Sequence, residues 1–126
     1  MVDTTVFSNV GCTAMSNATY ALGTWKYVGW GTGTTAAAKT ATVCENEAAE
    51  TSTTKVTGTQ SQNTVTTTND ELQCIGTVTC ASATKTIANA GLFNTTTTGM
   101  MMYGTFTAIT VSIGDSIQFT FKLQVT

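Results

Sequence analysis

Few side chains in this sequence can do acid–base, nucleophilic or metal chemistry. There is no histidine, so the commonest general base and the commonest metal ligand are both absent. Ser-His and Cys-His nucleophile arrangements are excluded for the same reason. The four cysteines, Cys12, Cys44, Cys74 and Cys80, contain no CxxC-type pair, the spacing typical of structural zinc sites. The sequence therefore predicts no metal site and no cofactor.

Seven carboxylates remain, and glycoside hydrolysis needs two of them facing each other across a cleft. Asp70 and Asp115 each follow a turn residue, while Glu45, Glu47 and Glu50 cluster in one polar segment. Turns and solvated surface account for these positions, so we expect no catalytic residue. A carbohydrate-active enzyme with a distant carboxylate pair stays open as a disfavoured alternative.

The even number of cysteines would indicate a disulfide framework in an exported protein. The first ten residues, MVDTTVFSNV, have neither a basic start nor an apolar stretch of signal-peptide length. Cys74 and Cys80 lie six residues apart, which separates them by about 20 Å in a straight strand. We therefore expect free, buried thiols in a chain made in the cytoplasm.

The composition describes the scaffold that would position these groups. The chain has 126 residues, of which 41% are apolar and only 10% are charged, against about 25% charged in typical soluble domains. Threonine makes up about a quarter of the chain, and β-branched side chains favour strands. The composition predicts one all-β domain over residues 1–126.

The charge balance excludes two classes of partner. With five basic residues, all of them lysine, and a net charge of −2, the chain has little with which to neutralise phosphates. We expect no nucleic-acid binding and no polybasic membrane site. No apolar run reaches the roughly 18 residues of a membrane span.

Several segments show strand periodicity. In DSIQFTFKLQVT, apolar residues 117, 119, 121, 123 and 125 alternate with polar ones, which predicts a half-buried strand. TAITVSIGD precedes it and ends in a Gly-Asp pair, so we expect these two segments to form or neighbour a hairpin. GMMMYGTFT and TKTIANAGLF, joined by NTTTTG, predict a second hairpin.

The remaining segments are less regular. ELQCIGTVTCA predicts a strand of about ten residues, and KVTGTQSQNTVTTTND predicts either one exposed hairpin or two short edge strands. Residues 36–50 hold the helix-forming residues, so we expect a short helix there or none. Residues 1–25 are interpreted as part of the domain or as an arm or extended segment. Together these segments predict an antiparallel, jelly-roll-like β-sandwich with at most one short helix.

The aromatic and methionine residues are the candidate interface. Trp25, Tyr27 and Trp30 lie close together before a Gly-Thr-rich stretch, and Met100, Met101 and Met102 precede Tyr103. Core packing and partner contact both explain such residues, because methionine adapts to irregular surfaces and aromatics are enriched in interface cores. Three consecutive methionines in a strand cannot all face one side, so either both faces are covered or at least one is exposed, and the pattern favours burial on two sides.

The order of several motifs resembles a group of small virion structural proteins of tailed bacteriophages. The motifs are KYVGWGTGTTAA, the acidic CENEAAE, IGTVTC, and the C-terminal IANAGLFNTTTTGMMMYGTFTAITVSIGDSIQFTFKLQVT. The group has an A-GLF-(D/N) pattern, a small-residue bridge, a Met- or Leu-rich strand and a final GD followed by hydrophobic alternation. The resemblance covers most of residues 26–126 and is strongest over 87–125. Tyr103-Gly104 stands where the group commonly has an arginine.

The resemblance implies a capsid decoration, or cement, protein. Such proteins sit on the outside of the bacteriophage head, often as trimers, and stabilise it by bridging subunits of the major capsid protein. It therefore implies a homotrimer, made in the host bacterial cytoplasm and found on the virion. The alternative is a phage tail or fibre module that binds host-surface glycans through Trp25, Tyr27 and Trp30.

Overall fold

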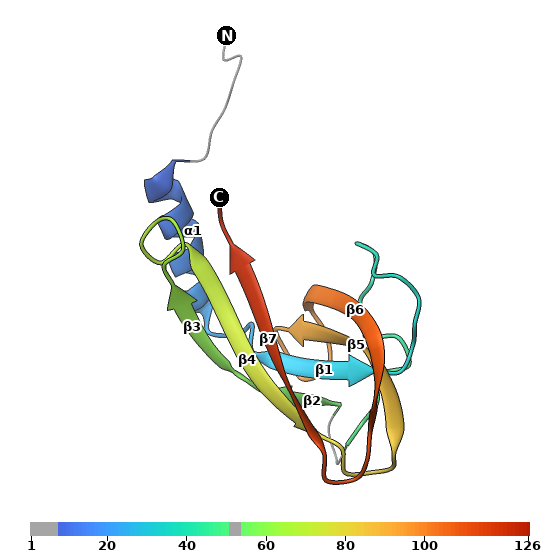
Figure 1. The fold of residues 1–126 in the computed structure, drawn as a ribbon. Helices are drawn as coiled ribbons and strands as arrows, with labels where there is room; N and C mark the ends of the chain where they lie inside the picture. The colour runs from blue at the N-terminus through green and yellow to red at the C-terminus, as the bar shows by residue number, and fades with distance from the viewer. Residues whose placement is uncertain (1–7, 51–53) are drawn as a thin grey trace.

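The computed structural model describes residues 8–50 and 54–126. Within these ranges, the elements in chain order are α1 (Asn9–Leu22), β1 (Tyr27–Gly31), β2 (Lys55–Thr57), β3 (Thr59–Asn63), β4 (Glu71–Thr79), β5 (Lys85–Phe93), β6 (Met100–Val111) and β7 (Ser116–Gln124). The strands form two antiparallel sheets: sheet A has the order β2-β1-β5-β6 and sheet B the order β3-β4-β7 (Figure 1). The predicted all-β sandwich with a single helix is confirmed.

The last four strands are wound as one long hairpin folded over on itself. β5 pairs with β6 in sheet A, and β4, which precedes β5, pairs with β7, which follows β6, in sheet B. The inner pair of strands therefore lies in one layer and the outer pair in the other. This winding makes β6 and β7 the end strands of their sheets.

The segments that become β6 and β7 do not pair with each other. Of the two expectations, they therefore neighbour a hairpin, that of β5 and β6, and do not form one. The tight turn at residues 112–115 instead carries the chain from sheet A to sheet B. Its backbone bonds to the end of β4: Gly114 N donates to Cys80 O, and Cys80 N donates to Asp115 O, both at 2.8 Å. These bonds place β7 beside β4 and away from β6.

Other strand predictions are confirmed. The β5–β6 hairpin closes through residues 94–99, where Asn94 N donates to Gly99 O at 3.0 Å and Gly99 takes a φ of 78°. ELQCIGTVTCA gives β4, and the C-terminal alternation gives β7. Of the two interpretations of KVTGTQSQNTV, the edge strands are correct: β2 ends sheet A and β3 ends sheet B.

The helix lies in the N-terminal segment, so the interpretation of residues 9–22 as extended is wrong. Ser8 caps α1 by accepting a hydrogen bond from Gly11 N at 3.2 Å, and Gly23 ends it in the left-handed conformation at φ 64°. Residues 36–50 contain no helix, only turns and a bridge between Gly31 and Glu47. No helix in the described residues, α1 included, is long and apolar enough to cross a membrane.

The core lies between the two sheets. Val28 and Trp30 from β1 and Leu92 from β5 have almost no exposed surface, and they meet Val78 of β4. Phe119 of β7 packs edge-on against Trp30, with ring centroids 6.3 Å apart. Sheet A covers one end of the inner face of sheet B, and α1 packs on the other end, against β3 and β4.

Candidate interaction surface

The described carboxylates each hold part of the structure. Asp70 has no exposed surface and accepts hydrogen bonds from the backbone N–H groups of Val65, Thr66 and Thr67 at 2.8 to 3.1 Å. These bonds hold the pKa of Asp70 well below its ordinary value. The bond from Val65 N contributes most, and together the bonds outweigh the effect of desolvation, which raises the pKa. Asp70 therefore fixes the loop between β3 and β4.

Glu50 joins the core to the β4–β5 connection. It accepts hydrogen bonds from Trp30 Nε1 at 2.9 Å and Ala81 N at 2.8 Å, and it pairs with Lys85. Desolvation raises its pKa, but the hydrogen bonds, led by that of Lys85, outweigh this effect and leave the pKa lowered. The carboxylate therefore stays charged where it is held.

The other described carboxylates have partners as well. Lys55 lies 2.9 Å from Glu47, with its ammonium 4.2 Å from the centre of the Phe93 ring. The remaining contacts join Glu71 to Lys122, Glu45 to Thr35 and Asp115 to Ser112. Asp3 lies outside the described residues. The six described carboxylates thus have structural roles, which offers no support for a hydrolytic pair.

All four cysteines are buried, and Cys44, Cys74 and Cys80 are free thiols, as predicted. Burial raises the pKa of Cys44 to about 12, with a contribution from Glu47, and raises the pKa of Cys74 to about 11. Such thiols stay protonated at neutral pH. Within the described part of the chain, no three potential ligand side chains come together to hold a metal ion.

The aromatic part of the predicted interface is only partly on the surface. Trp30 is 0% exposed and belongs to the core, so its assignment to an interface is wrong. Trp30 lies in β1 two residues after Val28, and both side chains belong to the hydrophobic core. Trp25 and Tyr27 are half-buried. The three rings therefore do not form one exposed stacking platform.

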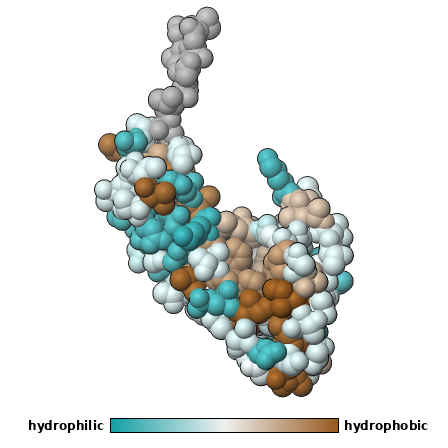
Figure 2. All heavy atoms as spheres, in the orientation of Figure 1, coloured by the Kyte–Doolittle hydropathy of each residue, from teal (hydrophilic) through white to brown (hydrophobic). Residues whose placement is uncertain are grey.

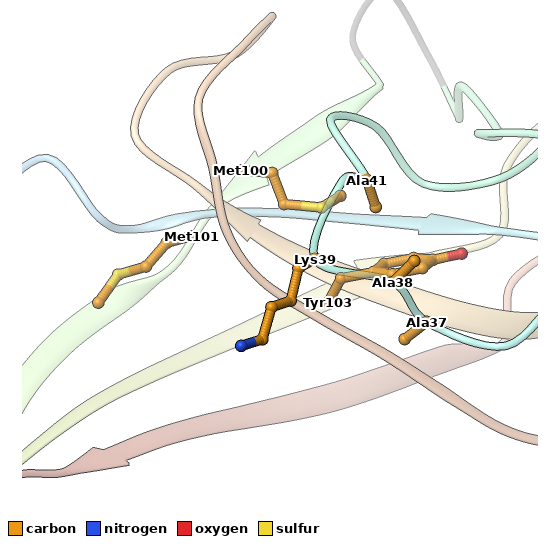
Figure 3. Close-up of a pocket in the computed structure, with 7 residues that line it drawn as sticks. All are labelled: Ala37, Ala38, Lys39, Ala41, Met100, Met101 and Tyr103. Carbon is orange, nitrogen blue, oxygen red and sulfur yellow. The ribbon is translucent and has the colours of Figure 1, made fainter.

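The methionines contact both faces of sheet A. Met101 and Met102 pack against the core, whereas Met100 and Tyr103 face the loop of residues 32–50. Figure 3 shows Met100 and Tyr103 directed toward the loop alanines, beside a cavity of about 300 Å³. The cavity is lined by Ala37, Ala38, Lys39, Ala41, Met100, Met101 and Tyr103. The three methionines are half-buried, and a role in partner contact stays a prediction.

Hydrogen bonds hold this loop over the outer face of sheet A. The buried Asn89 donates from Nδ2 to the carbonyls of Gly33 and Glu45, at 2.9 and 3.0 Å. Gly31 lies beneath Asn89, where an added Cβ would come within 2.7 Å of Oδ1, so only glycine allows this approach. Asn89 therefore holds the two ends of this loop, at residues 33 and 45, against sheet A.

An apolar surface lies along β7. Its apolar residues face the inside of the sandwich, but β7 ends sheet B and sheet A does not cover it fully. Ile117, Phe119 and Phe121 remain half-buried and Leu123 is 37% exposed. Figure 2 shows the molecule hollowed between two arms, with apolar atoms at the base of the hollow and hydrophilic atoms on the left-hand arm. One arm holds α1 and the ends of β3, β4 and β7, and the other holds β5, β6 and loop 32–50 (Figure 1).

The helix gives the second exposed apolar surface. Its buried residues are the small Cys12 and Ser16, whereas Val10 is 80% exposed, Leu22 65% and Met15 53%. The usual arrangement of a surface helix, apolar side inward, is thus reversed. The sequence signal was available, because Val10, Ala14, Ala18 and Leu22 follow each other at spacings of four. The position of β7 at the end of sheet B, in contrast, follows from the nested pairing of β4 to β7.

Comparison of the chain with protein-family models, with curated proteins and with solved structures finds no match in any of the three. The fold and surface therefore define only a class of molecule at this point. That class is a small antiparallel sandwich with two uncharged apolar surfaces that a single chain leaves open.

Proposed function

We propose that this chain is a non-enzymatic capsid decoration protein of a tailed bacteriophage. It binds the outside of the head as a homotrimer and stabilises the capsid by bridging subunits of the major capsid protein. The proposal starts from the resemblance over residues 87–125. In the fold this stretch is one continuous unit, the β5–β6 hairpin followed by β7.

The observation that carries the proposal is the apolar surface that one chain leaves uncovered. Phe119, Phe121 and Leu123 on β7 keep exposed apolar area beside the hollow. Contiguous apolar patches of this kind mark binding surfaces in soluble proteins. A protein that works by binding other subunits needs such a surface and needs no catalytic group.

The free sheet edges favour an assembled state. β6 is a 12-residue end strand with no charged residue and no proline, and β7 has Lys122 as its one charge. Exposed edges are usually protected by such residues, or by pairing with a neighbour. On a symmetric capsid, many modest contacts act together, so a small protein gains affinity by repeated binding.

The glycan-binding alternative has no comparable support. It requires Trp25, Tyr27 and Trp30 to present their rings to solvent, and Trp30 is fully buried. We therefore do not carry it forward as a second function.

Imaging of purified virions tests the proposal. We expect density for this chain at regular positions on the capsid exterior, and particles without it that lose their DNA at lower temperature. Adding the purified protein back should restore the density and the heat resistance. Density confined to the tail, or absence of the chain from purified virions, would contradict the proposal.

A further inference from the structure

Lys39 lies in an exposed stretch of the loop of residues 32–50. Residues 34–40 are all exposed, and they form neither helix nor strand. A turn closed by Ala41 N, which donates to Ala38 O at 3.0 Å, contains Lys39 and Thr40. In Figure 3 the Lys39 side chain extends from the loop, and its ammonium lies apart from the other labelled side chains. Lys39 and its neighbours on both sides are therefore open to solvent.

Hydrogen bonds close the base of this exposed stretch. Gly33 N donates to Glu45 O at 3.1 Å, and Ala48 N donates to Trp30 O at 3.0 Å. The side chain of Asn89 in β5 binds the carbonyls of residues 33 and 45 as well. The exposed stretch is thus joined to the sandwich at both of its ends, and its own residues lie outside that closed base.

The other four lysines lie where the backbone is held in the sandwich. The chain has five basic residues, all lysines, and all five are described. Lys55 is only 3% exposed, and Lys85 begins β5. The carbonyl of Lys26 accepts a hydrogen bond from Gly58 N at 2.6 Å, directly before β1. The side chain of Lys122 is 55% exposed, but its backbone lies in the ladder between β4 and β7.

This contrast decides where a protease can cut. Proteases that cleave after lysine bind its ammonium in a pocket with a carboxylate at the base, and they also need the backbone around the scissile bond. Exposed loop tips with small and polar residues are the usual sites of such cleavage, whereas bonds within strands become available only when the structure opens. The Lys39–Thr40 bond is available in the folded chain.

We infer that Lys39 is a specific cleavage site for a trypsin-like protease, and that the cleaved chain stays folded as two fragments, residues 1–39 and 40–126. Water adds across the peptide bond: its hydroxyl goes to the carbonyl carbon of Lys39 and its hydrogen to the nitrogen of Thr40. The new ends are a carboxylate and an ammonium group at neutral pH. The cleavage is independent of the proposed function, because it needs only the loop and its closed base.

The contacts of the first fragment explain why the two parts stay together. Residues 1–39 include α1 and β1, and β1 lies between β2 and β5 in sheet A, paired with both. Val28 and Trp30 of β1 belong to the hydrophobic core. Cleavage at Lys39 breaks none of these contacts and none of the hydrogen bonds at the base of the loop. It removes only the connection through the loop.

Limited digestion of the folded wild type with trypsin tests the inference. Under denaturing conditions, intact mass spectrometry should show fragments 1–39 and 40–126 as the first products. Under native conditions, both fragments should remain in one complex that is heavier by one water per chain. Cleavage after any other lysine should be at least about 10³-fold slower, because it requires the sparsely populated open form of the domain. The circular dichroism spectrum should not change on the first cut.

Two variants separate side-chain exposure from backbone exposure. Lys39→Gln should stay intact over the time in which the wild type is fully cleaved. Lys122→Gln is the matched control: it removes the same charge from an exposed lysine side chain whose backbone lies in a strand. It should be cleaved after Lys39 as fast as the wild type. Circular dichroism and thermal melts establish that both variants are folded.

Several results would overturn the inference. A first cut after another lysine, or equal rates after Lys39 and Lys122, would mean that the folded backbone does not select the site. A wild type that trypsin leaves intact would mean that the loop does not enter the protease. Fragments that separate, or that lose the native spectrum on cleavage, would show that the connection through the loop is needed to hold β1 in sheet A.

Discussion

Asp70 is the residue on which the β3–β4 loop depends most. Its carboxylate accepts three backbone N–H groups and the Thr66 hydroxyl, so replacement by Asn leaves several donors unsatisfied. We expect Asp70→Asn to lower the free energy of unfolding at pH 7. Asp115→Asn keeps an amide oxygen that can accept the single bond from Ser112 N, so it should lower the free energy of unfolding less.

The pH dependence of this difference follows from the lowered pKa of Asp70. A lowered folded-state pKa contributes stability above the unfolded value of about 3.9, and the contribution is lost as the pH falls from there toward the folded value. Urea unfolding of wild type and Asp70→Asn should therefore differ most near pH 7 and converge below about pH 4. A constant difference would show that the carboxylate charge has no part in it.

Trp30 combines core packing with a buried hydrogen bond. Replacement by Phe removes the donor to Glu50 and leaves a void between the sheets. We expect a loss of about 2–4 kcal/mol in the free energy of unfolding. The half-buried Trp25, replaced in the same way, should cost less than half as much. Equal losses for the two variants, measured by denaturant titration, would mean that Trp30 is less buried than the structure has it.

Strands β1 and β4 approach each other closely across the sandwich at Gly76. A Cβ added at Gly76 would lie 2.6 Å from Cγ2 of Val28, with the Cβ of that valine at 3.0 Å. Gly76→Ala therefore overpacks the centre of the sandwich and should destabilise it by roughly 1–3 kcal/mol. Gly104 in β6 is the matched control, since an added Cβ there meets nothing within 4 Å.

Thermal melts and denaturant titrations of Gly76→Ala and Gly104→Ala measure this difference in stability. Gly104→Ala should stay within about 0.5 kcal/mol of the wild type, as is usual for surface positions. If Gly76→Ala is as stable as Gly104→Ala, the two sheets are not as close at this point as described.

Individual elements were predictable where the local pattern matched the environment. The alternation in β7 and the turn chemistry of residues 94–99 are local signals, and both gave the correct element. The partner of β7 was not predictable, because the bonds to Cys80 that set it lie about 35 residues away along the chain. Helix α1 was missed because its inward side is small and polar, the reverse of the expected periodicity.

The candidate interaction surface was also predictable only in part. Aromatic and methionine content indicated which residue types would matter, yet burial separates Trp30 from Tyr103. Exposure of Phe121 and Leu123 arises because β7 is an end strand, which is a property of the sheet order. A single sequence does not specify that order.

At the scale of the whole molecule, assembly should be insensitive to salt. The net charge is only −2, and neither α1 nor β6 carries a charged side chain. Salt screens charge–charge contacts but leaves apolar ones intact. Light scattering from low to high sodium chloride should therefore report an unchanged oligomer. Dissociation on adding salt would point to lysine–carboxylate pairs as the true contact.

The nested winding of β4 to β7 also sets the order of events during synthesis. Glu71 pairs with Gln124, so sheet B cannot close until nearly the whole of the described chain has left the ribosome. Pairing over such long separations is slow, and β4 waits with an unpaired edge while translation continues. Each copy is therefore a late-folding chain, in which β7 both completes sheet B and brings in its half-buried aromatic residues.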